Sequence, residues 1–384
     1  MHTTSFEFRS VPRIVVARGG AQRLAEWLPG LAGMRRPLLV TDPGVRALAE
    51  PCCTALSEAG VALAVFDAVQ PDPPPEVVER ALALAHEHRA DGVIGLGGGS
   101  SLDSAKLVAL LAGSRQELPA TFGVNQASGP RLPLVLVPTT AGTGSEVTPI
   151  AIVTTGADTK QGIVSPWLLP DLALLDATLI RGLPPAVTAA TGIDAMVHAI
   201  EAYTSLRLKN PMSDALALQA LALLDRWLPR AWAEGEDLEA REQTLLGACM
   251  AGMAFANAPV AAVHALAYPL GARFHVPHGL SNALVLGPVL RFNAPQAELL
   301  YAELGRHLGL GAGRDETSAC TAFIEHMTAL SARLGLPTRL RDVGVQAGDL
   351  DRLADDAMLQ TRLLINNPRP LTRADARELY ASAL

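Results

Sequence analysis

The sequence predicts two domains of different fold class, an α/β domain with a parallel sheet followed by an all-α domain. The chain has 384 residues, more than one ordinary hydrophobic core holds. In the first half, short apolar runs alternate with amphipathic segments, whereas past about Leu183 Ala/Leu-rich segments replace the strand-like runs. We therefore expect residues 1–183 and 184–384 to form the two domains.

The predicted strands of the first domain are short apolar runs bounded by turn residues. They are PLLVT (37–41), ALAVF (62–66), GVIGL (92–96), LVLV (134–137) and IAIVT (150–154). Between them, PEVVERALALAHEHR (75–89) has helical spacing and a proline at its start. Strands that alternate with helices indicate a parallel sheet with helices on its faces.

The second domain begins after RGLPPAV (181–187), whose prolines continue neither a helix nor a strand. Segments such as MSDALALQALALLDRWL (212–228) and YAELGRHLGL (301–310) predict helices. The thirty residues from Gln243 to Ala272 carry no Asp, Glu, Lys or Arg and are long enough to span a bilayer. Because prolines and polar residues interrupt this stretch, and Ala and Gly dominate it, we expect buried helices of a protein core.

Composition narrows the classes of partner. The net charge is −7, so no basic field attracts nucleic acid or an anionic membrane. The four cysteines show no metal-binding or paired disulfide spacing and are expected to be reduced. The first residues lack a basic segment followed by an apolar one, so we expect no signal peptide and a cytoplasmic location.

A glycine-rich turn follows one predicted strand. VIGLGGGSSLDSAK (93–106) is an apolar strand, then Gly97, Gly98 and Gly99, then a helix that opens at Ser100 or Ser101. Free N–H groups at a helix start favour an anion, and a diphosphate fits there. The GxGxxG fingerprint fails because Ser100 replaces the third glycine, and no GKS or GKT is present. A tight turn without a ligand is the alternative.

A second Gly/Thr/Ser cluster, PTTAGTGSEVT (138–148), follows another apolar strand. Loops at the carboxyl ends of neighbouring parallel strands line the ligand crevice of such sheets. Asp42 ends a further strand, where a carboxylate accepts hydrogen bonds from ribose hydroxyls and repels a 2′-phosphate. This favours NAD over NADP, although an Asp before Pro-Gly is also an ordinary turn former.

Histidines and one carboxylate suggest a metal site in the second domain. Asp194 and His198 are four residues apart in a helical segment and so share one face. With His264 and His278 they make a donor set that suits Fe(II) or Zn(II) better than Mg or Ca. A hydrogen-bonded Asp–His pair is the alternative, and His275 is another candidate for the fourth ligand.

By these motifs the chain resembles the iron-containing, group III alcohol dehydrogenase family. The resemblance runs almost end to end. It is carried by GGGSSLDSAK, PTTAGTGSEVT, SPWLLPDLALLDATL (165–179), GIDAMVHAIEAY (192–203), AGMAFANA (251–258), PHG (277–279) and NNPRPLTRADARELY (366–380). It implies the dehydroquinate synthase-like architecture, an N-terminal dinucleotide-binding domain and a C-terminal helical domain, with the active site in the cleft between them.

The resemblance also implies roles for individual residues. By motif position the metal ligands are Asp194, His198, His264 and His278, which leaves His275 as a neighbour. The positions on the cofactor side are Asp42, Gly97, Gly98, Gly99, Ser100, Asp103, Thr139, Thr140, Thr143, Ser145 and Lys160. Phe255 falls on the wall of the substrate pocket, as Ile150 and Ile152 are expected to do.

Two positions depart from the family pattern. Many members have a histidine four residues after the third ligand, often assigned to proton transfer, and here Tyr268 takes its place. We expect its hydroxyl to hold a water or a cofactor ribose hydroxyl, or to pass the proton itself. The frequent PNP turn is PDP (71–73), so Asp72 stands where an amide touches the cofactor.

The expected function is metal-dependent hydride transfer between NAD(H) and a small alcohol or aldehyde. Maleylacetate reduction and a dehydroquinate synthase-like lyase reaction are the alternatives within this architecture. A metallohydrolase would need a general base, for which Glu201 is the candidate, although we expect it to be solvated or to pair within its helix. The strand-like SFEFRS (5–10) and RIVVA (13–17) are expected to pair across a two-fold axis in a homodimer.

Overall fold

A computed structural model describes residues 5–31, 33–156, 159–311, 313 and 315–384. These residues form two compact units. Residues 9–181 make up an α/β unit, and residues 182–384, together with residues 5–8, make up a helical unit.

The α/β unit is built on a six-stranded sheet in the order β1-β9-β6-β4-β2-β3. Every pair of neighbouring strands in it is parallel. The strands are β1 (Ile14–Val16), β2 (Pro37–Val40), β3 (Ala64–Phe66), β4 (Gly92–Gly97), β6 (Leu134–Pro138) and β9 (Leu172–Leu175). The parallel α/β prediction is therefore confirmed: all five predicted runs contain a strand, and four of the five strands belong to this sheet.

The fifth run differs from the prediction. β7 (Ile150–Thr155) does not join the parallel sheet but pairs antiparallel with β8 (Thr159–Val164). β8 also pairs with β5 (Gly123–Val124), which completes a separate three-stranded sheet. An apolar run predicts a strand but not the strand with which it pairs. Here the short connection between β7 and β8 favours antiparallel pairing of these two strands.

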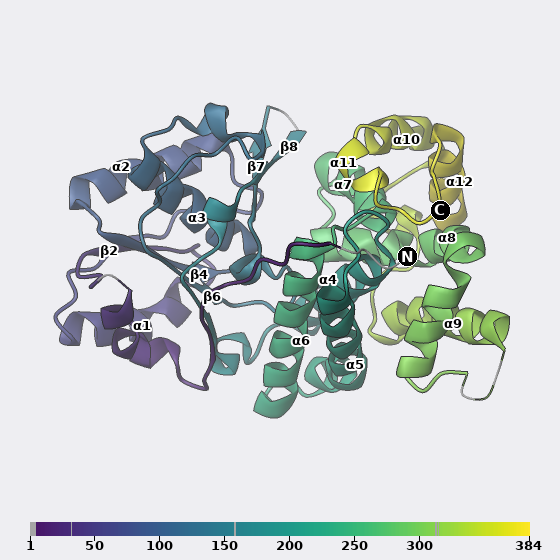
Figure 1. Ribbon diagram of the computed structural model, residues 1–384, viewed down its shortest axis with the longest axis horizontal. Helices are drawn as coiled ribbons and strands as arrows, with labels where there is room; N and C mark the ends of the chain where they lie inside the picture. Colours follow the sequence, from purple (N-terminus) through teal and green to yellow (C-terminus); the bar gives the residue numbers. More distant parts are fainter. Residues whose placement is uncertain (1–4, 32, 157–158, 312, 314) are drawn as a thin grey trace. The chain divides into compact units, whose positions relative to one another are not determined.

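Helices cover both faces of the parallel sheet (Figure 1). They are α1 (Arg46–Glu58), α2 (Pro75–His88) and α3 (Gly99–Ser114). Along β2, Leu38 and Val40 pack into the core beneath α2 and α3, whereas Leu39 packs into the core beneath α1. All three side chains are fully buried, as the alternation of a strand with two covered faces requires.

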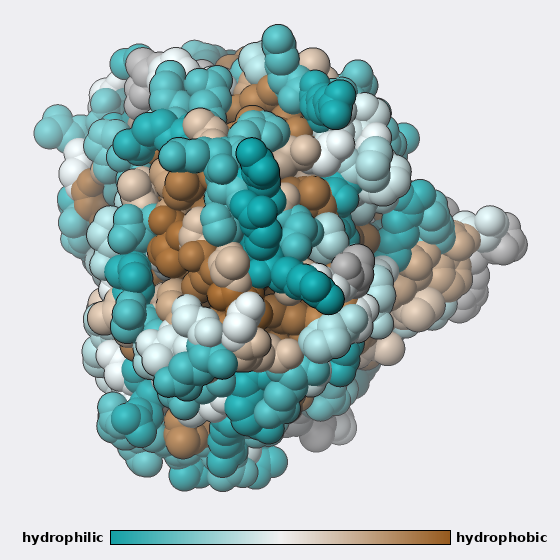
Figure 2. All heavy atoms as spheres, turned by 90° about the vertical axis from the view of Figure 1, so that its left-hand side faces the viewer, coloured by the Kyte–Doolittle hydropathy of each residue, from teal (hydrophilic) through white to brown (hydrophobic). Residues whose placement is uncertain are grey.

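The sheet ends at the edge strand β3. Hydrophobic side chains around this strand, among them Val61, Leu63 and Val65, are only partly buried against the core below α1. Figure 2 looks onto the side of this unit on which α1 and α2 lie in Figure 1. Hydrophobic residues gather near the middle of that face, and hydrophilic residues surround them.

The pairing of the N-terminal runs across a two-fold axis stays a prediction, but the two runs have different structures within the chain. Within RIVVA, Ile14–Val16 forms β1 and pairs in parallel with β9 at the edge of the large sheet. Residues 5–10 of SFEFRS form no strand. The run LALL, which becomes β9, is fully buried between β1 and β6.

The helical unit contains no strand among its described residues. Its helices are α4 (Pro185–Thr204), α5 (Pro211–Ala233), α6 (Leu238–Asn257), α7 (Ala262–Phe274), α8 (His278–His307), α9 (Glu316–Arg333), α10 (Leu350–Met358), α11 (Thr361–Leu364) and α12 (Arg373–Ala383). Local signals set several of their starts: the side chains of Asn210 and Asp237 cap α5 and α6, and prolines begin α4 and α5.

The charge-free segment forms the second half of α6 and most of α7, and most of its side chains are buried. In the part of the chain that the structure describes, no single helix is both long and apolar enough to cross a membrane. Only α6 and α7 satisfy that criterion as a pair, and they are bent by 106° relative to each other.

Candidate functional site

Four metal-ligating side chains lie together in the helical unit. α4 supplies Asp194 and His198, one turn apart; His264 comes from the first turn of α7, and His278 is the first residue of α8. Their donor atoms all lie within 4.8 Å of one another. The Nε2 atoms of His198, His264 and His278 lie 3.9, 3.8 and 3.6 Å from Asp194 Oδ1.

These separations are close to those around one bound cation. Donor atoms about 2.0–2.2 Å from a common ion are about 3.3–3.6 Å apart when the angles between them are near tetrahedral. The distances of 3.6 to 3.9 Å from Asp194 Oδ1 are therefore only slightly wider than a bound ion requires. Three imidazoles and one carboxylate suit Fe(II) or Zn(II). His275 lies outside the cluster and instead ends α7 in a left-handed backbone conformation, with φ of 53°.

A close approach of two helices brings His278 to Asp194. At Gly279 a Cβ atom would lie 2.2 Å from the carbonyl oxygen of Ala190, one turn before Asp194 on α4. Glycine is therefore required at this position, because any side chain would force α8 away from α4. This explains the glycine of the PHG motif.

Asp194 is ionised in this environment. Its burial opposes ionisation, but His198, His278 and His264 and a hydrogen bond from Asn282 together lower the pKa of its carboxyl group below the usual value. Only 2% of Asp194 is exposed, so protein groups rather than water surround this charge. The cluster thus presents a buried anion to a cation.

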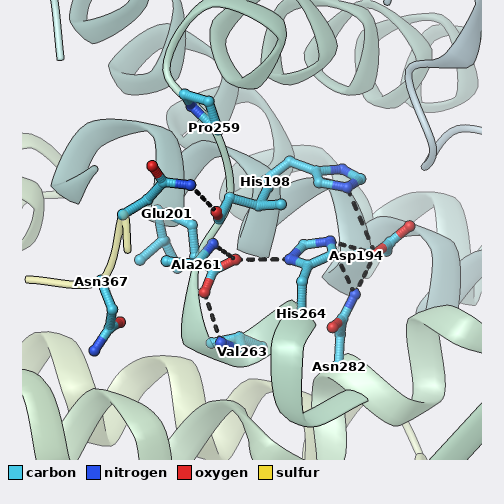
Figure 3. A network of polar contacts seen from close by, with 12 residues as sticks. Asp194, His198, Glu201, Pro259, Ala261, Val263, His264, Asn282 and Asn367 are labelled. Atoms are coloured by element: carbon cyan, nitrogen blue, oxygen red, sulfur yellow. Dashed lines mark hydrogen bonds and ion pairs between the residues drawn. The ribbon is translucent and has the colours of Figure 1, made fainter. Parts of the chain in front are cut away.

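Glu201 is not solvated and does not pair within its helix, so that expectation was wrong. It is buried, and its Oε2 lies 2.7 Å from Nδ1 of His264 (Figure 3). The same carboxylate accepts hydrogen bonds from the backbone N–H groups of Ala261 and Val263. A carboxylate accepts only, so Nδ1 of His264 carries a proton, and Nε2 is the ring nitrogen that faces the cluster.

The sequence gives one signal that is consistent with this role of Glu201. It lies seven residues after Asp194, two helical turns along α4, and so lies near the same face of the helix. The chain that leads into α7 is also held by Ser205, whose Oγ donates to Pro259 O, and by Asn366, whose Nδ2 donates to Val260 O. His264 is therefore fixed both through its ring and through its backbone.

Two aromatic side chains border the histidines. The ring of Phe255, on α6, stacks on His198 with ring centroids 4.2 Å apart. Tyr268 lies one turn after His264 on α7, and its ring centroid is 5.8 Å from that of His278. Both residues predicted to act near the metal thus contact ligand rings. Ile150 and Ile152 belong to β7 in the other unit, where both are partly buried.

In the α/β unit, the glycine turn joins β4 to α3. The N-cap of α3 is Gly98 and no side chain caps this end, so the first N–H groups of a 16-residue helix are left for another acceptor. A Cβ atom at Gly97 would lie 2.6 Å from Ser101 Oγ, so this position requires glycine, which has φ of 154°. Asp42 accepts from Ser101 Oγ and from Gly44 N, so it is both a turn former and a neighbour of α3.

The second loop lies directly beside the first, because β4 and β6 are neighbours and Gly97 pairs with Pro138. Cβ atoms at Gly98 and Gly99 would lie 3.8 and 3.0 Å from the methyl groups of Thr140 and Thr143. The buried Oγ1 of Thr139 has no hydrogen-bond partner among the described residues. Two polar loops and a free helix end thus face one another.

The remaining cofactor-side residues make contacts within the α/β unit. Asp103 accepts hydrogen bonds from Ser145 Oγ and from the N–H of Ile152. Ser100 is partly buried in the first turn of α3. Lys160, on β8, forms a 2.6 Å ion pair with Asp72, whose backbone has φ of 51°.

Comparisons with known proteins cover nearly the whole chain. The family profile described as iron-containing alcohol dehydrogenase matches residues 12–177, and that of the C-terminal part of the Fe-containing alcohol dehydrogenase family matches residues 188–384. The long-chain-alcohol dehydrogenase 1 of Geobacillus thermodenitrificans is 41% identical over 357 residues, covering 91% of this chain and 90% of that protein.

Solved structures with a similar fold are also alcohol- or aldehyde-converting enzymes. A 1,3-propanediol oxidoreductase has a TM-score of 0.95 at 35% identity, covering 99% of this chain and 100% of that one. A sulfoacetaldehyde reductase from Bifidobacterium kashiwanohense in complex with NAD+ has a TM-score of 0.89 at 27% identity, covering 99% of each chain. The chain belongs to the iron-containing alcohol dehydrogenase family, which implies a metal ion and typically NAD(H), and it is an oxidoreductase that acts on alcohols or aldehydes.

Proposed function

We propose that this enzyme transfers hydride between NAD(H) and a small alcohol or aldehyde at a metal ion held by Asp194, His198, His264 and His278. The observation that carries the proposal is the convergence of these four donor atoms within 4.8 Å, with Asp194, His198 and His264 buried and His278 partly exposed. We assign metal and substrate binding to residues 184–384 and dinucleotide binding to residues 1–183.

The donor set supports Fe(II) as the native ion, with Zn(II) as the other candidate, because both accept three imidazoles and one carboxylate. When bound, the metal ion polarises the substrate oxygen as a Lewis acid, and the nicotinamide supplies or accepts the hydride. The protein's part is to hold the four donors in place. Glu201 does so for His264 by fixing the proton on Nδ1.

The α/β unit is suited to the dinucleotide. The free N–H groups at the start of α3, beside Gly97, Gly98 and Gly99, are suited to the diphosphate. The carboxylate of Asp42, next to Ser101, favours the free ribose hydroxyls of NAD over the 2′-phosphate of NADP. The other residues that we assign to the cofactor are Ser100, Asp103, Thr139, Thr140, Thr143, Ser145 and Lys160.

Apolar groups shape the substrate pocket in this proposal. Phe255, stacked on His198, forms one wall, and Ile150 and Ile152 contribute from β7. An apolar wall suits a short aliphatic or small hydroxylated aldehyde. We assign the hydroxyl of Tyr268, next to His278, to holding a water or a cofactor ribose hydroxyl near the reacting oxygen.

The test is an assay of purified protein loaded with Fe(II) or Zn(II), with NADH or NADPH and a panel of aldehydes. We expect a net loss of NADH absorbance with simple aldehydes, a lower rate with NADPH, and no turnover after a chelator removes the metal. Turnover of a substrate with no net change in NADH would instead indicate a lyase. Activity only with maleylacetate would assign the other reductase reaction.

Assembly and location complete the proposal. We propose a homodimer, because β1 is an edge strand with one unpaired side and Val16 on it is 45% exposed. Sedimentation velocity tests this. We place the enzyme in the cytoplasm, since Cys52, Cys53, Cys249 and Cys320 are buried and form no disulfide, which suits a reducing compartment.

A further inference from the structure

Asn282 contacts the metal-ligand cluster although no sequence pattern pointed to it. It lies one turn after His278 on α8 and is fully buried. Its Nδ2 donates a 2.6 Å hydrogen bond to Oδ1 of Asp194 and lies 3.3 and 3.4 Å from Nε2 of His264 and His278. One amide group therefore approaches three of the four ligand atoms.

The contact with Asp194 selects one of two equivalent oxygens. The terminal torsion of an aspartate is broad and roughly two-fold, so either oxygen, or both, can face a bound ion. Here Oδ1 faces all three imidazole Nε2 atoms, at 3.6 to 3.9 Å, and Oδ1 is also the oxygen that Asn282 holds. Because Asp194 is 2% exposed, bulk water does not replace a lost donor.

We propose that Asn282 is a positioning residue of the metal centre, whose amide holds Oδ1 of Asp194 toward the three imidazoles so that the carboxylate binds the ion through this oxygen alone. The inference rests on the metal centre proposed above. It adds a residue that does not itself bind the ion but determines how a ligand presents its donor atom.

The chemistry of an amide suits this position. A lysine or arginine would donate a hydrogen bond but would place a positive charge beside the cation, whereas the amide donor is neutral. In Figure 3, Asn282 and His198 approach Asp194 from opposite sides. The amide of Asn282 thus lies on one side of the carboxylate. His198, on which Phe255 stacks, lies on the other side.

Asn282→Leu removes the donor with little change in volume, and Asn293→Leu is the matched control. Asn293 is also buried on α8, but its amide pairs with Asn367 rather than with a metal ligand. The full-length proteins, freed of metal, are titrated with Co(II) in competition with a chelator, and the visible absorption of the bound Co(II) is recorded.

We expect Asn282→Leu to weaken Co(II) binding about 10- to 100-fold and to change the Co(II) spectrum, as loss of a group that orients a ligand does. Asn293→Leu is expected to lower thermal stability but to keep the wild-type affinity and spectrum. Wild-type affinity and spectrum in Asn282→Leu would overturn the inference. Failure of the wild-type protein to bind Co(II) would instead overturn the metal centre itself.

If Asn282→Leu does not fold, Asn282→Ala replaces it with the same expectations. A crystal structure of the Co(II)-loaded wild-type enzyme gives an independent measurement. We expect Asp194 Oδ1 on the ion and Asn282 Nδ2 within hydrogen-bond distance of that oxygen. An Asn282 amide turned away from Asp194, or a carboxylate bound through both oxygens, would overturn the inference without any variant.

Discussion

Nδ1 of His264 lies 2.7 Å from Oε2 of Glu201, and both groups are buried. Glu201 also accepts the N–H groups of Ala261 and Val263, so one carboxylate fixes the ring of a metal ligand and the backbone at the start of its helix. This arrangement makes Glu201, a residue outside the proposed ligand set, part of the proposed metal centre.

Glu201→Gln is therefore expected to weaken metal binding about 10- to 100-fold. A glutamine has one acceptor oxygen and an NH2 group, so it cannot accept from all three N–H donors at once. Chelator competition measures the affinity. Asp225→Asn is the control, because Asp225 pairs with His326 in the same unit without a metal ligand nearby. Equal metal affinity in the two variants would contradict the role of Glu201.

Tyr268→Phe keeps the ring beside His278 and removes only the hydroxyl. If the hydroxyl holds a water or a ribose hydroxyl, kcat falls several-fold while the metal affinity stays at the wild-type value. The pH dependence of kcat then shifts, because the proton takes a less ordered route. A rate that equals wild type across the whole pH range would remove Tyr268 from the proton path.

Gly98→Ala tests whether the glycine turn between β4 and α3 binds the cofactor or is only a tight turn. The added methyl group would lie 3.8 Å from Thr140, an ordinary contact, so stability is expected to change little. The methyl group would, however, stand between the two polar loops where we place the diphosphate, and the dissociation constant for NADH is expected to rise about tenfold or more. Fluorescence titration with NADH measures this. Gly348→Ala, where a Cβ atom meets nothing, is the control.

Asp72→Asn restores an amide at the position where the family frequently has one. The change releases Lys160 from its ion pair and removes a negative charge at a position that the resemblance places beside the cofactor, so NADH is expected to bind a few-fold more tightly. The effect is small because Asp72 is largely exposed. In a Lys160→Met background the gain should shrink to the part that comes from the lost negative charge; a gain of the same size there would show that Lys160 is not involved.

Glu146 predicts a specific dependence of stability on pH. Burial raises its pKa from 4.5 to about 7. Between these values the folded protein keeps a proton that the unfolded chain has lost, so stability is highest at acidic pH and falls as the pH rises through about 7. Glu146→Gln is expected to remove this slope, on the order of a few kcal/mol between pH 5 and 8. Urea unfolding at several pH values measures the free energy of unfolding of both proteins. The same dependence on pH in the two proteins would exclude the effect.

Local pattern predicted much of the α/β unit. The apolar runs that become β2, β4 and β6 and the helix that becomes α2 were all expected, because burial on both faces and helical periodicity are visible within a few residues. The neighbouring order of β4 and β6, which brings the two polar loops together, was expected only from the general rule for parallel sheets. The antiparallel pairing of β7 was not expected.

The sequence by itself determined which side chains are candidates for binding a metal ion, since Asp194 and His198 share a helix face by spacing alone and the family motifs single out His264 and His278. Only the tertiary structure decided how these groups are held. Glu201 reaches His264 across 63 residues and Asn282 reaches Asp194 across 88. Such contacts depend on how closely the helices pack, as the Gly279 contact with Ala190 illustrates, and helical periodicity within each segment contains no record of that distance.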